Sequence, residues 1–249
     1  MTDQRSEAPV GILMLDTSFE RLPGDIGNHG TWPFPVVYET VSDASPAQIV
    51  IEQNPVWLDA FKEAADRLEA VGVAGITTSC GFLGLYQSAL AEHCSVPVAT
   101  SALLQVPVVE RLIGPAKRVG ILTYNADSLT DAHLTAVGVD VTTPVVGMAG
   151  SSTFFRWIMD GDNSVTLATL RDDAVFAARR LVEDNPDVGA IVCECTNLSP
   201  FAKDIHKAVK RPVYDMVSML HWFRLGLTPM YGFEKLQQEG LRIGEDLVT

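Results

Sequence analysis

The sequence predicts an α/β protein built from two similar lobes. Short apolar runs rich in β-branched residues alternate with segments whose apolar residues recur at helical spacing. Several runs are apolar on both faces, which is typical of parallel strands covered by helices. The same landmarks also occur twice, in the same order. The alternation predicts mostly parallel sheets with right-handed crossovers, and the repetition predicts two similar lobes.

The apolar runs predict six strands. They are Val10–Leu15, Val73–Thr77, Val96–Ala99, Arg118–Thr123, Ala190–Cys193 and Pro212–Tyr214. The longest uncharged segment, residues 70–91, has the length of a membrane span. Its glycines, threonines and serines predict a buried strand, a turn and a helix instead.

The first long helix is expected after Asn54, which can cap it, and Pro55, which fits its first position. Gly72 stands where a left-handed stop is common. The apolar stripe has helical spacing and consists of Trp57, Phe61, Ala64, Leu68 and Val71. Further helices are expected over 126–137, 170–183, 199–209 and 216–225.

The internal repeat divides the chain. The run Gly11-Ile12-Leu13 recurs as Gly120-Ile121-Leu122, and the strand that leads to Cys80 is matched by a strand that leads to Cys195, 115 residues later. We expect one lobe from residues 1–113 plus 215–249 and a second lobe from residues 114–214. A ligand site between the lobes is the natural consequence.

Composition excludes several classes of protein. Of 249 residues, 47% are hydrophobic, which is too many for a disordered chain. The net charge of −13 and the lack of a basic patch argue against nucleic-acid binding. Four cysteines are too few for a disulfide scaffold, and the polar N-terminus is unlike a signal peptide. We therefore expect a soluble, cytoplasmic protein with reduced thiols and without a nucleic-acid or membrane partner.

Cys80 and Cys195 are the residues most suited to chemistry. Each follows a predicted strand and precedes a predicted helix, where free N–H groups can stabilise a thiolate or bind a carboxylate. A single cysteine is often a small buried hydrophobe, and we interpret Cys94 and Cys193 in this way. Two cysteines at equivalent positions of a repeat indicate a function. Neither a zinc-binding pattern nor a phosphate-binding glycine motif occurs, so neither a metal nor a nucleotide is expected.

Four short motifs carry a resemblance to a known family that covers most of the chain. They are Leu15-Asp16-Thr17, Thr78-Ser79-Cys80-Gly81, Leu122-Thr123-Tyr124-Asn125 and Glu194-Cys195-Thr196-Asn197. With the two cysteine turns at this separation, the chain resembles the aspartate/glutamate racemase superfamily. That superfamily includes hydantoin racemases, arylmalonate decarboxylase and maleate isomerase.

The resemblance implies two pseudo-twofold-related lobes with a cofactor-independent site in the cleft between them. One thiolate removes a proton from the carbon next to a carboxylate, and a thiol on the opposite face returns one. Cys80 and Cys195 are then the acid/base pair of a racemase or epimerase for an amino acid, a hydantoin or a related carboxylate-type small molecule. The decarboxylase branch keeps only the second-lobe cysteine, so the presence of both favours racemase chemistry.

Other functions stay open at this point. A maleate-type cis–trans isomerase and an arylmalonate-type decarboxylase share the scaffold. A non-catalytic regulatory protein that binds small anions is an alternative of another class. The sequence also leaves a homo-oligomer open.

The resemblance implies a set of substrate-binding residues. In the family the acidic residue after the first strand contacts the substrate amino group or orients a cysteine, whereas Asp16 could instead cap a loop. Thr196 is expected to bind a carboxylate by its hydroxyl and backbone N–H. The full expected set is Asp16, Thr17, Arg21, Ser79, Gly81, Phe82, Tyr124, Asn125, Thr196 and Asn197.

Three positions point away from glutamate as the substrate. Asn197 stands where glutamate racemases have histidine, and Gly81-Phe82 replaces their Asn-Thr, which predicts a more apolar pocket.

Arg21 lies in the loop 19–35 after the first strand. It could pair with a second substrate carboxylate, or it could only bind Glu20 or Asp25.

Overall fold

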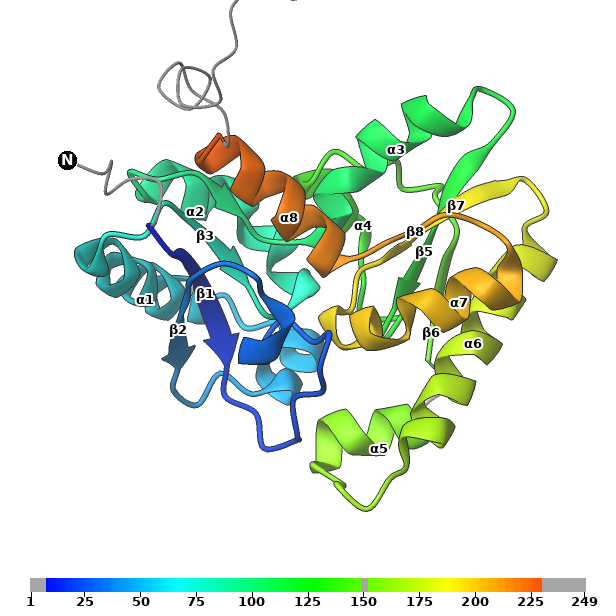
Figure 1. Cartoon of the computed structure of the whole chain (residues 1–249), viewed down its shortest axis with the longest axis horizontal. Helices are drawn as coiled ribbons and strands as arrows, with labels where there is room; N and C mark the ends of the chain where they lie inside the picture. Colours follow the sequence, from blue (N-terminus) through cyan, green and yellow to red (C-terminus); the bar gives the residue numbers. More distant parts are fainter. Residues whose placement is uncertain (1–7, 149–151, 230–249) are drawn as a thin grey trace, which may run out of the picture.

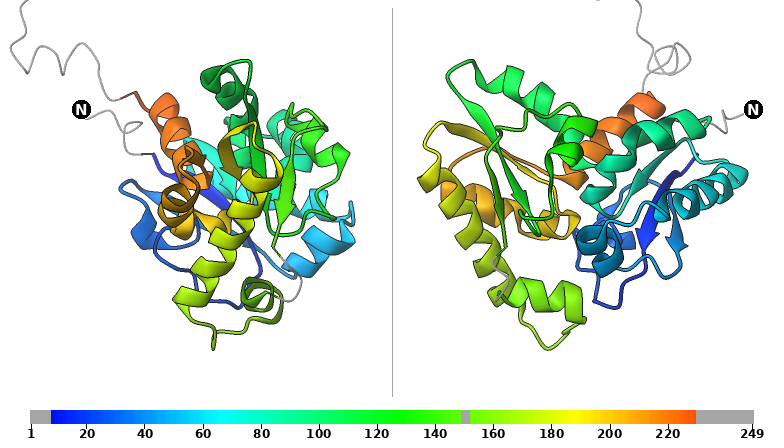
Figure 2. Two further views of the ribbon diagram at one scale, coloured as in Figure 1. Left: turned by 90° about the vertical axis from the view of Figure 1, so that its right-hand side faces the viewer. Right: turned by 180° about the vertical axis from the view of Figure 1, so that it is seen from behind.

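Two parallel four-stranded sheets form the protein (Figure 1). The structure is a computed structural model that describes residues 8–148 and 152–229. Helices flank each sheet, and the two sheets lie beside each other as separate lobes in every view (Figure 2). The predicted α/β fold with two lobes is confirmed.

The first sheet has the order β2-β1-β3-β4. Its strands are β1 (Val10–Leu15), β2 (Val36–Val41), β3 (Gly75–Thr78) and β4 (Val98–Ala99). All six residues of β1 are buried, because this strand lies between two neighbours and under helices. That burial explains its continuous apolar sequence.

The second sheet repeats this plan with the order β6-β5-β7-β8. Its strands are β5 (Arg118–Thr123), β6 (Val145–Gly147), β7 (Val188–Cys193) and β8 (Val213–Tyr214). All strand pairs in both sheets are parallel, and β5 takes the place that β1 has in the first sheet. The repeat seen in the sequence is therefore a repeat of the fold.

Two of the four edge strands, β2 and β6, do not appear among the predicted strands. Their residues are mostly half-buried, since each pairs on one side only. β2 also carries Glu39 and Thr40 within its six residues. A search for fully apolar runs finds central strands and passes over edges of this kind.

Helices connect the strands as crossovers. In chain order they are α1 (Trp57–Val71), α2 (Gln87–His93), α3 (Val106–Ile113), α4 (Asp131–Ala136), α5 (Thr153–Asp160), α6 (Leu167–Asp184), α7 (Ala202–Val209) and α8 (Met216–Leu227). α4 is shorter than the predicted helix 126–137, because a capping box of Thr130 and His133 starts it late. α3, in the range predicted for the first lobe, packs on β5 and β7.

The predicted stripe of α1 faces the first sheet. Phe61, Ala64, Ala65 and Leu68 are buried, and Gly72 ends the helix with a φ of 84°. Val71 is an exception, because it is 62% exposed. A Cβ on Gly11 would lie 2.9 Å from Leu68, and the equivalent Gly120 has the same relation to Leu181 of α6. The repeated glycines thus let one helix pack closely on each central strand.

α8 packs on β3, although it follows the second sheet in sequence. Asp215 and Ser218 form its capping box, and Phe223 and Leu227 lie against Gly75.

Across residues 8–148 and 152–229, no helix combines the length and apolar character needed to cross a membrane.

Candidate active site

A pocket of about 390 Å³, counting its open mouth, lies where the carboxyl ends of four strands meet. Leu15 ends β1, Ser79 and Cys80 follow β3, Tyr124 follows β5, and Glu194 and Cys195 follow β7. Of the residues expected from the sequence, eight besides the cysteines line it: Thr17, Arg21, Ser79, Gly81, Phe82, Tyr124, Thr196 and Asn197. The structure thus places both thiols and most of the expected set in one pocket.

Cys80 caps the short 3₁₀ helix η4 (Gly81–Tyr86) and is 8% exposed. Burial and the charge of Glu194 raise the pKa of its thiol to about 12. Three groups act in the opposite direction: the backbone N–H groups of Phe82 and Leu83, and the guanidinium of Arg21. Cys80 is therefore a thiol at rest, in a site that contains donors for a thiolate.

Cys195 caps the equivalent helix η6 (Thr196–Phe201) in the second lobe and is 7% exposed. Burial, Glu194, Cys80 and Asp25 all raise its pKa, and only the backbone N–H of Asn197 opposes them. Its Sγ donates to Oδ1 of Asn197 at 3.8 Å. The two thiols thus lie close enough to interact electrostatically, in unequal surroundings.

Glu194 is a buried carboxylate between the lobes. Its Oε2 accepts a hydrogen bond from Thr123 Oγ1 at 2.5 Å, while Oε1 accepts none from any residue that the structure describes. Burial raises its pKa to about 7. A carboxyl group with this pKa can hold or release a proton at neutral pH beside the two thiols.

This buried carboxyl should make stability depend on pH. The pKa of Glu194 is raised from 4.5 to about 7, so the folded state binds the proton more tightly than the unfolded state. The free energy of unfolding is then largest below pH 4.5 for this group and falls by about 3 kcal/mol as pH rises to 7. Glu194→Gln should remove that fall.

Urea unfolding at pH 5 and pH 8 measures the effect in the wild type and in Glu194→Gln. Glu92→Gln, which changes an exposed glutamate of α2, is the matched control. It should keep the wild-type difference between the two pH values. An equal difference in Glu194→Gln would show that Glu194 titrates normally.

Close packing joins the lobes next to the thiols. A Cβ on Gly81 would overlap the carboxylate and the carbonyl oxygen of Glu194. Thr196 Oγ1 donates to the carbonyl oxygen of Ser79 at 2.7 Å, so this hydroxyl is used between the lobes. Ser79 Oγ in turn accepts from the backbone N–H of Leu15 at 2.9 Å. Gly81, Ser79 and Thr196 therefore fix the separation of the two cysteine turns.

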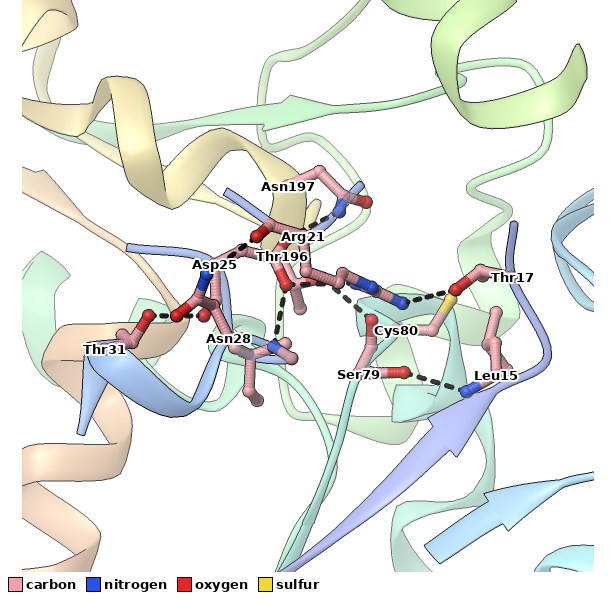
Figure 3. A network of polar contacts seen from close by, with 12 residues as sticks. Leu15, Thr17, Arg21, Asp25, Asn28, Thr31, Ser79, Cys80, Thr196 and Asn197 are labelled. Atoms are coloured by element: carbon pink, nitrogen blue, oxygen red, sulfur yellow. Dashed lines mark hydrogen bonds and ion pairs between the residues drawn. The ribbon is translucent and has the colours of Figure 1, made fainter. Parts of the chain in front are cut away.

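The loop after β1 supplies the charged wall of the pocket (Figure 3). Arg21 is 14% exposed, donates to Thr17 Oγ1 at 3.0 Å and forms an ion pair with the fully buried Asp25 at 3.1 Å. Asp25 also accepts from Nδ2 of Asn197 at 2.7 Å. Arg21 thus binds Asp25, as one of the two alternatives predicted, and it also lines the pocket, so pairing with a substrate carboxylate stays a prediction.

Asp16 and Asn125 lie outside the pocket lining. Asp16 is exposed and accepts from the backbone N–H of Asp43 at 3.1 Å, which is the loop-capping alternative. Asn125 accepts from the backbone N–H of Ser128 at 3.2 Å. Both side chains stabilise turns.

Aromatic rings form much of the remaining wall. Phe82 contacts the His133 ring edge-on at 5.3 Å, and Tyr124 stacks on Phe155 at the same distance. Phe19 lies under the Arg21 guanidinium at 4.5 Å. The site is thus mainly apolar, with one cation and one buried acid at its edge.

Two functional roles are not predicted from the sequence. Glu194 lies in the motif of Cys195, yet only the structure shows its carboxylate beside both thiols. Asp25 is predicted only as a possible partner of Arg21, and its contact with Asn197 leaves no pattern in the sequence. No group of three or more His, Cys, Asp or Glu side chains in the described ranges is arranged to hold a metal ion.

The chain is similar to known proteins in sequence and in fold. Residues 34–223 match the family model described as Asp/Glu/Hydantoin racemase. Among solved structures, arylmalonate decarboxylase aligns with a TM-score of 0.56 at 17% identity, covering 89% of this chain and 94% of that one. Glutamate racemase RacE1 from Bacillus anthracis gives 0.57 at 14% identity, covering 94% and 84%.

Curated relatives carry another name. A dimethylsulfoniopropionate lyase from Durusdinium sp. clade D is 28% identical, over 96% of this chain and 84% of its own length. Dimethylsulfoniopropionate lyase 5 from Emiliania huxleyi (strain CCMP1516) is 27% identical over 93% of this chain, which spans 48% of that protein. The family model covers most of the chain, and the chain belongs to the Asp/Glu/hydantoin racemase family.

Proposed function

We propose that the protein removes the proton from the carbon next to a carboxylate and eliminates a sulfonium leaving group from the adjacent carbon. The substrate class is a 3-sulfoniopropionate such as dimethylsulfoniopropionate. The observation that carries the proposal is one pocket containing two thiols, one guanidinium and aromatic walls. The relatives named dimethylsulfoniopropionate lyase support the choice of leaving group.

The elimination needs one base. The Cys80 thiolate takes the Cα proton, and the C–H electron pair becomes the double bond between Cα and Cβ. The Cβ–S bond breaks with its electrons going to sulfur, which leaves as a neutral sulfide. The products are acrylate, dimethyl sulfide and a Cys80 thiol, which then returns its proton to solvent.

The pocket suits both ends of such a substrate. Arg21 offers a guanidinium to the carboxylate. The rings of Phe82 and Tyr124 can face a sulfonium, since a cation is attracted to an aromatic face. Asp16, the family's partner for an ammonium group, points elsewhere, so a substrate without an amino group fits better.

A racemase or epimerase is the second candidate. The observation in its favour is that thiols from both lobes line the same pocket, as proton exchange on two faces of a carbon requires. Its substrates would be an amino acid, a hydantoin or a related carboxylate. A lyase releases acrylate, whereas a racemase changes only the configuration at Cα.

One product assay separates these functions. Purified protein is incubated with dimethylsulfoniopropionate and, separately, with single enantiomers of amino acids and hydantoins. We expect acrylate by NMR and dimethyl sulfide in the headspace. Loss of enantiomeric purity without acrylate would establish the racemase instead. Binding by calorimetry without any turnover would identify the non-catalytic alternative.

The rate should depend on pH in a defined direction. Since the pKa of Cys80 is raised to about 12, its thiolate fraction increases with each step in pH through the neutral range. We expect kcat/KM to rise from pH 6 to pH 9 without a plateau. A plateau below pH 8 would show that the base has a pKa near 7, as Glu194 does.

A further inference from the structure

A continuous set of contacts joins the second-lobe cysteine to the loop of the first lobe, and Figure 3 shows its part from Asn197 to Asp25 and Arg21. Cys195 Sγ donates to Asn197 Oδ1 at 3.8 Å, and Asn197 Nδ2 donates to Asp25 Oδ2 at 2.7 Å. The other oxygen of Asp25 accepts from Gly27 N–H at 2.7 Å and from Arg21 at 3.1 Å. Asp25 is fully buried.

The carboxylate decides how the amide lies. A carboxylate paired with Arg21 has only acceptor atoms, so the NH₂ group of Asn197 must face Asp25. Its carbonyl oxygen is then turned toward Cys195. An acceptor beside sulfur favours the protonated thiol, because a thiolate has no proton to donate.

The groups around the two cysteines also favour a protonated thiol at Cys195 over one at Cys80. Cys80 has two backbone N–H groups and the Arg21 cation near its sulfur. The titratable groups that act on Cys195 are Glu194, Cys80, Tyr124 and Asp25, none of them a cation. The ionised form of Cys80 thus has two N–H donors and a cation beside it, whereas that of Cys195 has one N–H donor, from Asn197.

We propose that Asp25 is a positioning residue, which holds Cys195 as a thiol through Asn197 and so leaves Cys80 as the single base. The inference rests on the proposed function, in which one base suffices. Asp25 lies outside the pocket lining and acts on Cys195 through the Asn197 amide and through its own negative charge. It therefore sets which thiol ionises without touching the substrate.

Asp25→Asn tests the proposal by inverting the amide. The new side chain must offer its oxygen to Gly27 N–H and Arg21, since both are donors. Its NH₂ group then faces Asn197, whose amide turns and presents N–H to Cys195. We expect Cys195 to be alkylated by iodoacetamide about tenfold faster at pH 8, with its rate profile shifted to lower pH.

Mass spectrometry of the labelled peptides gives the rate for each cysteine without any substrate, so failure of the lyase assay would not affect this result. Cys193 is fully buried two residues away and reports loosening of the second lobe. It should stay unlabelled. Asp140→Asn, at an exposed aspartate that accepts from the Thr142 N–H at 2.8 Å, is the matched control and should leave Cys195 unchanged.

Asn197→Leu provides a second route if Asp25→Asn folds poorly. It removes the acceptor without adding a donor, so Cys195 should react faster, but less so than in Asp25→Asn. In the Asn197→Leu background, adding Asp25→Asn should change the rate by less than about threefold. An unchanged Cys195 profile in Asp25→Asn, a parallel rise at Cys193, or the full tenfold effect without Asn197 would overturn the proposal.

Discussion

Cys80→Ser should lower kcat/KM for the elimination by about 10²- to 10⁴-fold, the usual contribution of a general base. Serine keeps the shape of the side chain, but its hydroxyl ionises far less readily than a thiol. The folded structure should be unaffected, since Cys80 makes no disulfide. Steady-state release of acrylate measures the loss, and Cys94→Ser, at a partly buried cysteine outside the pocket, is the matched control.

Cys195→Ser separates the two candidate functions. Elimination needs only the Cys80 thiolate, so this variant should keep its kcat/KM within about tenfold of the wild type. If the protein is a racemase, the Cys80→Ser and Cys195→Ser variants should lose activity equally, because each thiol serves one face of the carbon. Elimination that survives in Cys80→Ser and is lost in Cys195→Ser would reverse the assignment of the base.

Gly81→Ala should have the largest effect on stability. The added Cβ would overlap the carboxylate and the backbone carbonyl of Glu194, and the backbone cannot yield as a flexible side chain can. We expect the free energy of unfolding to fall by about 1–3 kcal/mol, as for other overpacked sites. Activity should fall as well, because the overlap pushes the two cysteine turns apart.

Gly226→Ala is the control for this change. Gly226 lies in α8, and a Cβ there would meet no atom within 4 Å in the part of the chain that the structure describes. Alanine favours a helix, so this variant should be neutral or slightly more stable. Urea unfolding of both variants measures the difference. Equal stability of Gly81→Ala and wild type would mean that the lobes do not pack as closely as described.

Much of the fold could be predicted because strands that are buried on both faces have a recognisable apolar sequence pattern. Central strands such as β1 and β5 are covered on both faces, so they appear as continuous apolar runs. The edge strands β2 and β6 are less buried, so they lack this apolar pattern. The late start of α4 depends on a side-chain cap by His133, which spacing does not indicate.

The internal repeat and the short motifs predict part of the candidate site. Equivalent positions in the two lobes identify Cys80 and Cys195, and their turns bring the adjacent residues with them. The direction of Asp16 depends on its contact with Asp43 in the same lobe. The contact of Asp25 with Asn197 depends on how the loop after β1 folds over the other lobe. Contacts of this kind join residues 172 positions apart and leave no local pattern.

In the proposed reaction the Cys80 thiolate attacks the Cα proton and not the carbon that carries the sulfonium. The most direct test is the rate of a single turnover with dimethylsulfoniopropionate that carries deuterium only at Cα. We expect a clearly slower turnover than with the unlabelled substrate, because the C–H bond breaks in the chemical step. An equal rate, together with a carboxyethyl group attached to Cys80, would contradict it, since the thiolate would then attack Cβ directly.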